Sequence, residues 1–262
     1  MGGSDGEVLV TGGRGTLGRF VVQHLEAAGV PVRLLSRRSP PADGESGARW
    51  VTGDLTDPAA VRGAVHGVGA VVHCASNFLK YKQDLVAARV LAEAAAAAGR
   101  PHVVYVSIVG VDRIPLGYYA VKRDVETLLL QSGLPVTIQR ATQFHELFLR
   151  ATGLLRRLPV VPVPAGFRFQ PIAADEVAAR LVALVSAEPR GRVDDIGGPE
   201  VHRGEDLVKA CLGALGARRP VVPLPVPGRT AAAYRAGHNL APGHAFGSTT
   251  FAEFLRSTRA GG

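Results

Sequence analysis

Residues 8–29 read VLVTGGRGTLGRFVVQHLEAAG and place three glycines, Gly12, Gly15 and Gly18, at intervals of three between an apolar run and a helical pattern. Each glycine has a physical reason: one permits a tight turn, one lets the backbone approach a pyrophosphate, and one allows close packing of helix on strand. The N-terminus of the following helix supplies unpaired N–H groups and the positive end of its dipole. The stretch therefore predicts a strand, a turn and a helix that bind the phosphates of a dinucleotide.

Short β-like runs alternate with helical patterns over the first half of the chain, which is the sequence form of βαβ units. Strands are expected at residues 7–11, 32–36, 49–52, 70–73, 102–107 and 136–140. The clearest helical pattern runs from Leu85 to Ala98 and is stopped by Gly99 and Pro101. The predicted fold class is therefore α/β, with a doubly wound parallel sheet.

The pattern changes after about residue 150. A Pro-rich connection, LPVVPVPAG (158–166), precedes a strand-like run at 167–172 and an amphipathic helical pattern at 175–187. A helix is expected near 204–215, a second Pro-rich run, VVPLPVPG, occupies 221–228, and TAAAYRAGH (230–238) is interpreted as a surface or lobe-interface helix. We predict a dinucleotide-binding domain over residues 1–155 and a smaller C-terminal α/β lobe over 156–262 that binds substrate and is partly interleaved with the first domain.

Composition and charge exclude several classes of protein. The chain has 262 residues, 47% of them hydrophobic and 20% charged, so it can bury a sizeable core. It carries 30 basic and 22 acidic residues, a formal net charge of +8. The basic residues are 26 Arg and 4 Lys, scattered singly or in pairs at 37–38, 156–157 and 218–219. Because the sequence contains no basic run and no nucleic-acid-binding signature, we expect no direct nucleic-acid partner.

Cysteine usage and hydropathy give further expectations. Cys74 and Cys211 lie far apart and in no Cys/His cluster, so neither a metal site nor a disulfide framework is predicted. No apolar run reaches the roughly 18 to 20 residues of a membrane span, and the start MGGSDGEVLV lacks the features of a signal peptide. We therefore expect no membrane partner and a cytoplasmic location.

The second strand ends in residues that bear on the choice of cofactor. An Asp or Glu about 20 residues after the glycine motif binds the ribose 2′-hydroxyl of NAD, whereas an Arg accommodates the 2′-phosphate of NADP. This chain offers Ser36, Arg37 and Arg38 there, and Arg14 lies within the glycine turn. The arrangement favours NADP(H), although arginines that simply coat the surface are the alternative.

Several motifs together resemble a known family. TGGRGTLG (11–18) matches the TGxxGxxG pattern of extended and atypical short-chain dehydrogenases/reductases, which have an NAD(P)-binding Rossmann fold. Residues 53–55 (GDL) resemble the segment that meets the adenine ring, and residues 74–77 (CASN) stand where the family has a turn after the fourth strand. SIVGVD (107–112), YYAVKRDVE (118–126) and QRATQFHE (139–146) resemble most the NmrA-like atypical branch.

The motifs and the resemblance together give the expected cofactor-binding residues. These are Gly12, Gly13, Arg14, Gly15, Thr16, Leu17, Gly18, Ser36, Arg37, Arg38, Asp54, Leu55, Cys74, Ala75, Ser76 and Lys122.

The resemblance also implies a set of catalytic residues. Tyr118 and Lys122 satisfy the family's YxxxK motif, and a spacing of four places both side chains on one face of a helix. In the family the Tyr exchanges a proton with the substrate oxygen, and a nearby ammonium is needed because a free phenol has a pKa near 10. Lys122 would supply that charge and hold the nicotinamide ribose, and Ser107 would bind the substrate oxygen. Tyr119 is a competitor of Tyr118 for the catalytic role.

Residues after the sixth strand are expected at the carboxyl edge of the sheet, where ligands of such folds bind. With Tyr119, the candidate substrate contacts are Gln143, Phe144 and His145. His145 is interpreted either as an auxiliary acid or base or as a packed residue between Phe144 and Phe148.

These observations predict an NADPH-dependent reductase that transfers hydride to a small, largely apolar or aromatic carbonyl or quinone-type substrate, acting as a monomer or homodimer. Two alternatives stay open from the sequence. One is a non-catalytic NADP(H)-binding redox sensor of the NmrA type, and the other is a sugar-type epimerase or dehydratase with a transient hydride step.

Overall fold

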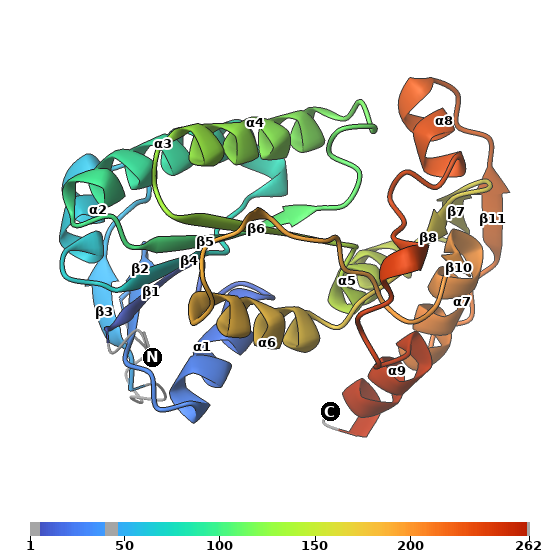
Figure 1. Ribbon diagram of the computed structural model, residues 1–262. Coiled ribbons are helices and arrows are strands. Elements are labelled where there is room, and N and C mark those ends of the chain that lie inside the picture. Colours follow the sequence, from blue (N-terminus) through green and yellow to red (C-terminus); the bar gives the residue numbers. More distant parts are fainter. Residues whose placement is uncertain (1–5, 40–46, 261–262) are drawn as a thin grey trace. The chain divides into compact units, whose positions relative to one another are not determined.

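The computed structural model describes residues 6–39 and 47–260, and its contacts divide the chain into two compact units (Figure 1). Unit 1 consists of Met1–Ser107, Ala120–Gln139 and Val177–Val193. Unit 2 consists of Ile108–Tyr119, Arg140–Glu176 and Asp194–Gly262. Each unit is therefore assembled from alternating segments of the chain.

The main sheet of seven parallel strands belongs mostly to unit 1. Its strands, in chain order, are β1 (Val8–Thr11), β2 (Val32–Ser36), β3 (Arg49–Thr52), β4 (Ala70–His73), β5 (His102–Ile108), β6 (Val136–Ala141) and β9 (Gly191–Arg192). Their order across the sheet is β3-β2-β1-β4-β5-β6-β9, so the direction of winding reverses between β1 and β4. The predicted doubly wound α/β fold is confirmed.

Helices cover both faces of this sheet. Figure 1 shows α2 (Pro58–Val65), α3 (Lys82–Ala97) and α4 (Gly117–Gln131) on one face, and α1 (Gly18–Ala27) and α6 (Ala174–Val185) on the other. β1, β4 and β5 are Val-rich because both of their faces are buried. The alanine tract of α3 serves close packing: Ala88, Ala92 and Ala95 are buried in a core that also holds Leu91 and Leu129.

Unit 2 has a core built around three helices. These are α5 (His145–Leu155), α7 (Gly204–Ala214) and α9 (Phe251–Ala260). Aromatic rings fill the space among them: Phe148 and Phe169 meet edge to face at 5.1 Å, and Phe251 and Phe254 pack beside Leu207. Burial of aromatic rings is the main stabilising contribution expected of such a core.

Two small sheets complete unit 2, and they differ from the sequence expectation. β7 (Val161–Pro164) pairs in parallel with β11 (Val221–Leu224), and β8 (Arg168–Phe169) pairs antiparallel with β10 (His202–Arg203). The predicted connection over 158–166 therefore contains a strand, and so does the second Pro-rich run. The strand predicted over 167–172 is only two residues long, because Gln170 leaves the ladder.

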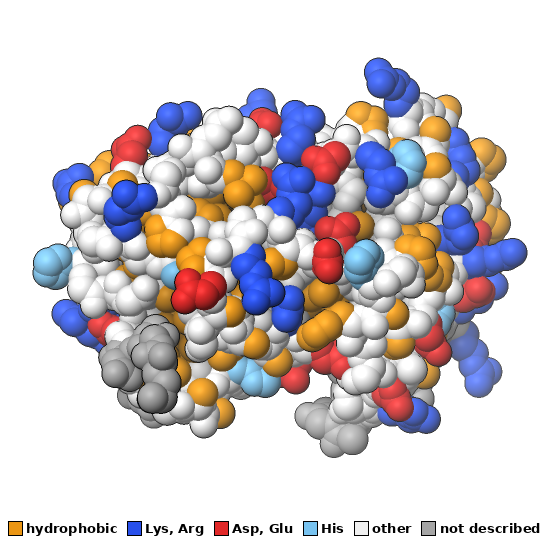
Figure 2. Space-filling model, in the orientation of Figure 1, with side chains coloured by type: hydrophobic (Ala, Val, Ile, Leu, Met, Phe, Trp, Pro, Cys, Tyr) orange, Lys and Arg blue, Asp and Glu red, His pale blue; other side chains and the backbone are white. Residues whose placement is uncertain are grey.

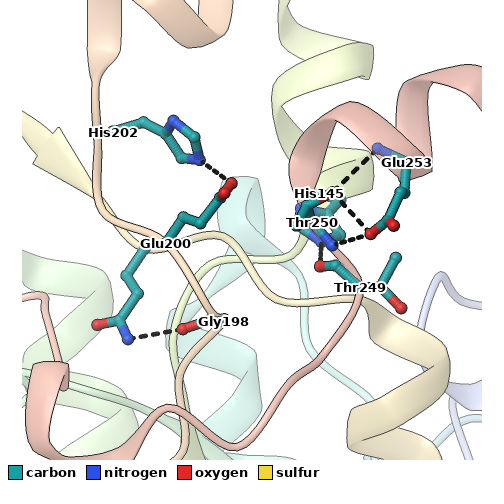
Figure 3. Close-up of polar contacts among 8 residues, drawn as sticks. His145, Gly198, Glu200, His202, Thr249, Thr250 and Glu253 are labelled. Carbon is teal, nitrogen blue, oxygen red and sulfur yellow. Dashed lines mark hydrogen bonds and ion pairs between the residues drawn. The ribbon is translucent and has the colours of Figure 1, made fainter.

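Gln170 is buried and joins three segments of unit 2. Its Oε1 accepts the Ala241 N–H at 2.8 Å, and its Nε2 donates to Gly198 O at 2.8 Å, a bond drawn in Figure 3. A buried amide that satisfies backbone groups in this way fixes loops that have no sheet to bind them. The remaining elements are α8 (Arg229–Arg235) and two 3₁₀ turns, Phe78–Lys80 and Pro242–His244. Within the described residues, no helix is long and apolar enough to cross a membrane.

Candidate functional site

The glycine turn lies directly after β1 and leads into α1, as the sequence predicts. Gly12 has a φ of +71°, a conformation that side chains other than glycine rarely adopt. The Gly15 N–H donates to Gly12 O at 2.8 Å and closes the turn. A Cβ added to Gly18 would collide with the backbone of Gly12, so the start of α1 packs against the turn without space for a side chain. The helix N-terminus is thereby held where an anion can approach it.

The loops after β1 and β4 meet at the point where the winding reverses. A Cβ on Gly12 would lie 2.7 Å from the backbone N of Ala75. The Cys74 N–H donates to Thr11 O at 3.2 Å, and the Thr11 hydroxyl lies 2.7 Å from Nδ1 of His73. Burial lowers the pKa of His73 to about 3, so the ring is neutral. In open α/β sheets this switch point is where nucleotides bind.

Asp84, which the sequence analysis did not single out, holds the turn after β4. Ser76 donates its hydroxyl to Asp84 Oδ2 at 2.6 Å, and the Asn77 N–H donates to Asp84 Oδ1 at 3.2 Å. Burial raises the pKa of Asp84. A carboxylate on α3 therefore fixes the segment that the resemblance assigns to the cofactor.

Lys122 and Ser107 lie in unit 1 near the carboxyl end of β5. Lys122 is 4% exposed, donates from Nζ to Val106 O at 3.2 Å, and has its Nζ 4.8 Å from the centre of the Tyr105 ring. Burial lowers the pKa of Lys122 to about 8, against the raising effect of Asp84. Ser107 is 2% exposed, and its Oγ has no hydrogen-bond partner among the described residues. A buried donor without a partner is costly unless a ligand satisfies it.

The end of β2 presents the predicted basic group. Ser36 ends the strand, its Oγ accepts the Arg38 N–H at 3.1 Å, and the Arg37 and Arg38 side chains are exposed. Arg14 is exposed in the glycine turn. Asp54 follows β3, and hydrogen bonds from Thr56 lower the pKa of Asp54, with a smaller effect of the Arg37 charge.

The two neighbouring tyrosines of α4 differ in their surroundings within unit 2. Tyr119 is 4% exposed, and its hydroxyl accepts from Tyr234 at 3.1 Å and from Gln143 Nε2 at 3.3 Å. Burial raises the pKa of Tyr119 well above its ordinary value. Tyr118 is partly exposed, with its ring edge-on to Tyr119 at 6.2 Å. No sequence motif indicates that Tyr234 contacts Tyr119, because the two residues are 115 positions apart in the chain.

His145 begins α5 and is fully buried in the aromatic core of unit 2. Its ring stacks on Phe254 at 5.1 Å. Its Nε2 donates to Thr249 O at 3.1 Å, and Figure 3 shows both of these residues. Burial lowers the pKa of His145 to about 4. Phe144 precedes the helix and bridges in parallel to Ile172. The structure therefore packs the His145 ring in the core and holds Phe144 through its backbone, and the predicted contact of both residues with substrate stays a prediction.

The geometry of unit 1 defines a class, the Rossmann-type nucleotide-binding proteins. A family model described as NAD(P)H-binding matches residues 12–188, which is more than half of the chain. The protein therefore belongs to this NAD(P)H-binding family. Within the described residues, no group of three or more His, Cys, Asp or Glu side chains is arranged to hold a metal ion.

Curated relatives of the chain include proteins named as reductases. The chain is 32% identical to the (4-alkanoyl-5-oxo-2,5-dihydrofuran-3-yl)methyl phosphate reductase of Streptomyces griseus, over 80% of this chain and 74% of that protein. It is 29% identical to the ceramide reductase of Caulobacter vibrioides, over 85% and 75%. It is also 29% identical to the photosystem II assembly factor Ycf39 of Trieres chinensis, over 84% and 72%.

Solved structures of the same fold include enzymes of several activities. The Escherichia coli NADPH-dependent quinone oxidoreductase bound to NADPH superposes with a TM-score of 0.79 at 22% identity, covering 96% of this chain and 99% of that chain. The Citrobacter triphenylmethane reductase bound to NADP(H) gives 0.71 at 17% identity, covering 95% and 94%. At these identities the likeness shows the fold.

Replacement of Gly12 tests the phosphate turn. In Gly12→Ala the new Cβ meets the Ala75 backbone and the residue keeps an unfavourable φ, so we expect NADPH affinity to fall by about tenfold or more. Gly63→Ala is the matched control, because a Cβ on Gly63 meets nothing within 4 Å. Calorimetric titration of both variants checks this, and unchanged affinity in Gly12→Ala would place the cofactor elsewhere.

His145 gives a prediction for acid stability. Because its folded pKa is about 4, below the ordinary 6.5, its contribution to stability is complete above about pH 6.5 and is lost as the pH falls toward 4. We expect the free energy of unfolding of the native protein to fall by roughly 2 kcal/mol between pH 6.5 and 5 relative to His145→Gln, whose amide keeps a donor for Thr249 O. Urea unfolding at several pH values measures the difference. His66→Gln, at an exposed position, should behave as the native protein does.

Proposed function

We propose that the protein is an NADPH-dependent reductase of the NmrA-like atypical short-chain dehydrogenase/reductase branch, which acts in the cytoplasm as a monomer or homodimer. Its substrate would be a small, largely apolar or aromatic carbonyl or quinone-type compound. The observation that carries the proposal is the buried Ser107 hydroxyl, which lacks a partner among the described residues at the carboxyl end of β5. Such a group is suited to bind a substrate oxygen.

The residues of the chain would divide the acid–base work among them. Bound NADPH supplies a hydride from C4 of the nicotinamide. Ser107 would donate a hydrogen bond to the substrate oxygen, and Tyr118 would give that oxygen a proton as negative charge develops on it. Lys122, one helical turn from Tyr118 on α4, would stabilise the phenolate that remains. The pKa of Lys122 is lowered to about 8 but still lies above neutral pH, so its amine is mostly protonated there. Stabilisation of a phenolate requires that charge.

The choice of Tyr118 over Tyr119 rests on their different surroundings. The Tyr119 hydroxyl already accepts two hydrogen bonds, and its raised pKa opposes formation of phenolate. Tyr118 is partly exposed and has the spacing of four to Lys122. We therefore assign proton transfer to Tyr118 and a positioning role to Tyr119.

The apolar character of the proposed substrate follows from the rings of unit 2. Tyr118, Tyr119 and Tyr234 belong to one hydrophobic cluster, and the Tyr234 ring stacks on Phe167 at 4.9 Å. Gln143 Oε1 is buried without a partner among the described residues and could accept a hydrogen bond from a ligand. The names of the two reductase relatives and of the quinone oxidoreductase support a carbonyl or quinone acceptor.

A non-catalytic NADP(H)-binding regulator is the second candidate. It is favoured by the relative named as a photosystem II assembly factor, since that name describes no reaction. The two candidates differ in turnover, because a regulator binds NADPH without oxidising it. An epimerase would return the hydride to its substrate and likewise give no net oxidation of NADPH. A nucleoside-diphosphate-sugar epimerase of Staphylococcus aureus shares the fold, with a TM-score of 0.81 at 17% identity.

Cofactor preference follows from the arginines after β2. In the double variant Arg37→Ser with Arg38→Ser, the dissociation constant for NADPH should rise by about tenfold to a hundredfold, because charged hydrogen bonds to the 2′-phosphate are lost. The constant for NADH should stay the same. Arg89→Ser, at an exposed position of α3, is the control. Tighter binding of NADH than of NADPH by the native protein would contradict the assignment.

The catalytic assignment is tested by exchange of single hydroxyl groups. With a panel of quinones and aromatic ketones, Tyr118→Phe should lower kcat by about 10²-fold to 10⁴-fold without changing NADPH affinity. Tyr119→Phe should keep kcat within about tenfold and lower the unfolding free energy by about 1 kcal/mol. NADPH binding without turnover across the panel, with no effect of Tyr118→Phe, would support the regulator instead.

A further inference from the structure

The two-stranded ribbon of β7 and β11 has an apolar face that unit 2 leaves uncovered. Its inner face is buried: Val161 and Val163 pack on Leu212 of α7. The register pairs Val222 with Pro162 and Leu224 with Pro164, and paired residues of a ladder share a face. The outer face is therefore made of proline, valine and leucine. Val222 and Leu224 are exposed by 38% and 47%.

Neighbouring segments extend this face. Leu158 and Val160 lead into β7 and are each 41% exposed, and Val226 follows β11. We define the ribbon patch as Leu158, Val160, Pro162, Val222, Leu224 and Val226. Single exposed apolar residues are common on protein surfaces, whereas a contiguous group of them indicates an interaction site.

Four arginines stand beside the ribbon patch. Arg156 and Arg157 follow α5, Arg218 and Arg219 precede β11, and all four line one open cavity of about 560 Å³. Arg219 donates from Nε to Arg156 O at 3.2 Å, which joins the two segments. All four side chains are exposed, and none forms an ion pair with a carboxylate of the described residues. On the edge of the molecule where β11 lies, Figure 2 shows hydrophobic side chains next to basic ones.

We propose that the ribbon patch and its four arginines dock unit 2 onto an anionic phospholipid bilayer. Arginine heads would bind lipid phosphates, and the aliphatic side chains would enter the boundary between headgroups and acyl chains. Because these four arginines form no ion pair with a carboxylate of the described residues, they are suited to bind an anionic surface. Because the ribbon patch beside them is apolar, the surface that fits both parts also offers a hydrocarbon layer.

Other occupants match only one half of this surface. A second copy docked through the same face would bring two sets of four arginines together, which like-charge repulsion opposes. A nucleic acid would bind the arginines but would leave the valines and leucines in water. The sequence-based expectation of no membrane partner rested on the lack of a spanning segment and of a signal peptide. Those criteria do not bear on docking at a surface, and the proposal replaces that expectation.

Vesicle sedimentation with the full chain tests the proposal. We expect no binding to phosphatidylcholine vesicles and binding that increases with the fraction of phosphatidylglycerol. Binding should be strong at about 0.1 M NaCl and largely lost at about 1 M, where charges are screened. Absence of binding at every phosphatidylglycerol fraction would overturn the proposal.

Variants separate the two halves of the surface. Arg156→Glu with Arg157→Glu should weaken partition by about tenfold or more. Val222→Ser with Leu224→Ser should weaken it by several fold while the salt dependence persists. The control for the arginine pair is Arg62→Glu with Arg89→Glu, at exposed positions of α2 and α3. The control for the apolar pair is Val86→Ser with Leu130→Ser, at exposed positions of α3 and α4. Unchanged NADPH affinity and thermal unfolding show that each variant folds.

Three further outcomes would contradict the proposal. Equal loss of partition in the control variants would show that net charge or general hydrophobicity is responsible rather than this surface. Binding to single-stranded RNA or heparin, lost in Arg156→Glu with Arg157→Glu and accompanied by no vesicle binding, would assign the arginines to a polyanion. A dimer that dissociates in Val222→Ser with Leu224→Ser would assign the patch to a second copy.

Discussion

The close approach of the loops after β1 and β4 is the constraint on which the nucleotide site depends. At Gly12 the backbone passes so near Ala75 that no Cβ fits, and its positive φ turns the chain away from the strand. The Thr11–His73 contact and the bond from Cys74 N–H to Thr11 O fix the two strand ends in register. The distance between these two loops is therefore set by close packing of backbone on backbone.

Two buried groups, the Lys122 ammonium and the Asp84 carboxylate, dominate the electrostatics near the turn after β4. Desolvation disfavours the charge of each, lowering the pKa of Lys122 and raising that of Asp84, while their attraction opposes both shifts. Asp84 also accepts hydrogen bonds from Ser76 and Asn77. The same carboxylate thus holds the turn after β4 and supports the charge of Lys122. A change in that turn would alter the proton affinity of Lys122, which links the turn after β4 to the proposed acid–base residues of α4.

Sequence patterns predicted the main sheet well because its strands obey a simple rule. Strands buried on both faces, such as β1, β4 and β5, are rich in valine, and the bounds of the six strands β1 to β6 agree with the prediction to within about one residue. β9 was missed because two residues, Gly191 and Arg192, carry no pattern. The segment that contains β7 is predicted as a connection because proline is usually excluded from strands, and no strand is predicted in the second Pro-rich run, where β11 lies. The candidate site residues also differ in how far the sequence predicts them. The glycine spacing and the YxxxK motif are local patterns that the sequence shows directly. Asp84 and Tyr234 have partners that only the folded chain brings close.

Proline also determines how the ribbon can interact. A third strand could add to the ribbon only through N–H and C=O groups on a free edge, and prolines at positions 162, 164 and 223 remove donors from these short strands. Edge pairing with another chain is therefore disfavoured, and the exposed side chains of the outer face remain as the means of contact. The ribbon cannot add a strand at its edge, but its outer face presents valine and leucine and has arginines beside it. Such a surface is suited to a lipid bilayer, because contact with a bilayer requires no hydrogen-bond register. Rigid short strands also keep the apolar side chains spread in one plane, so that they meet such a surface together.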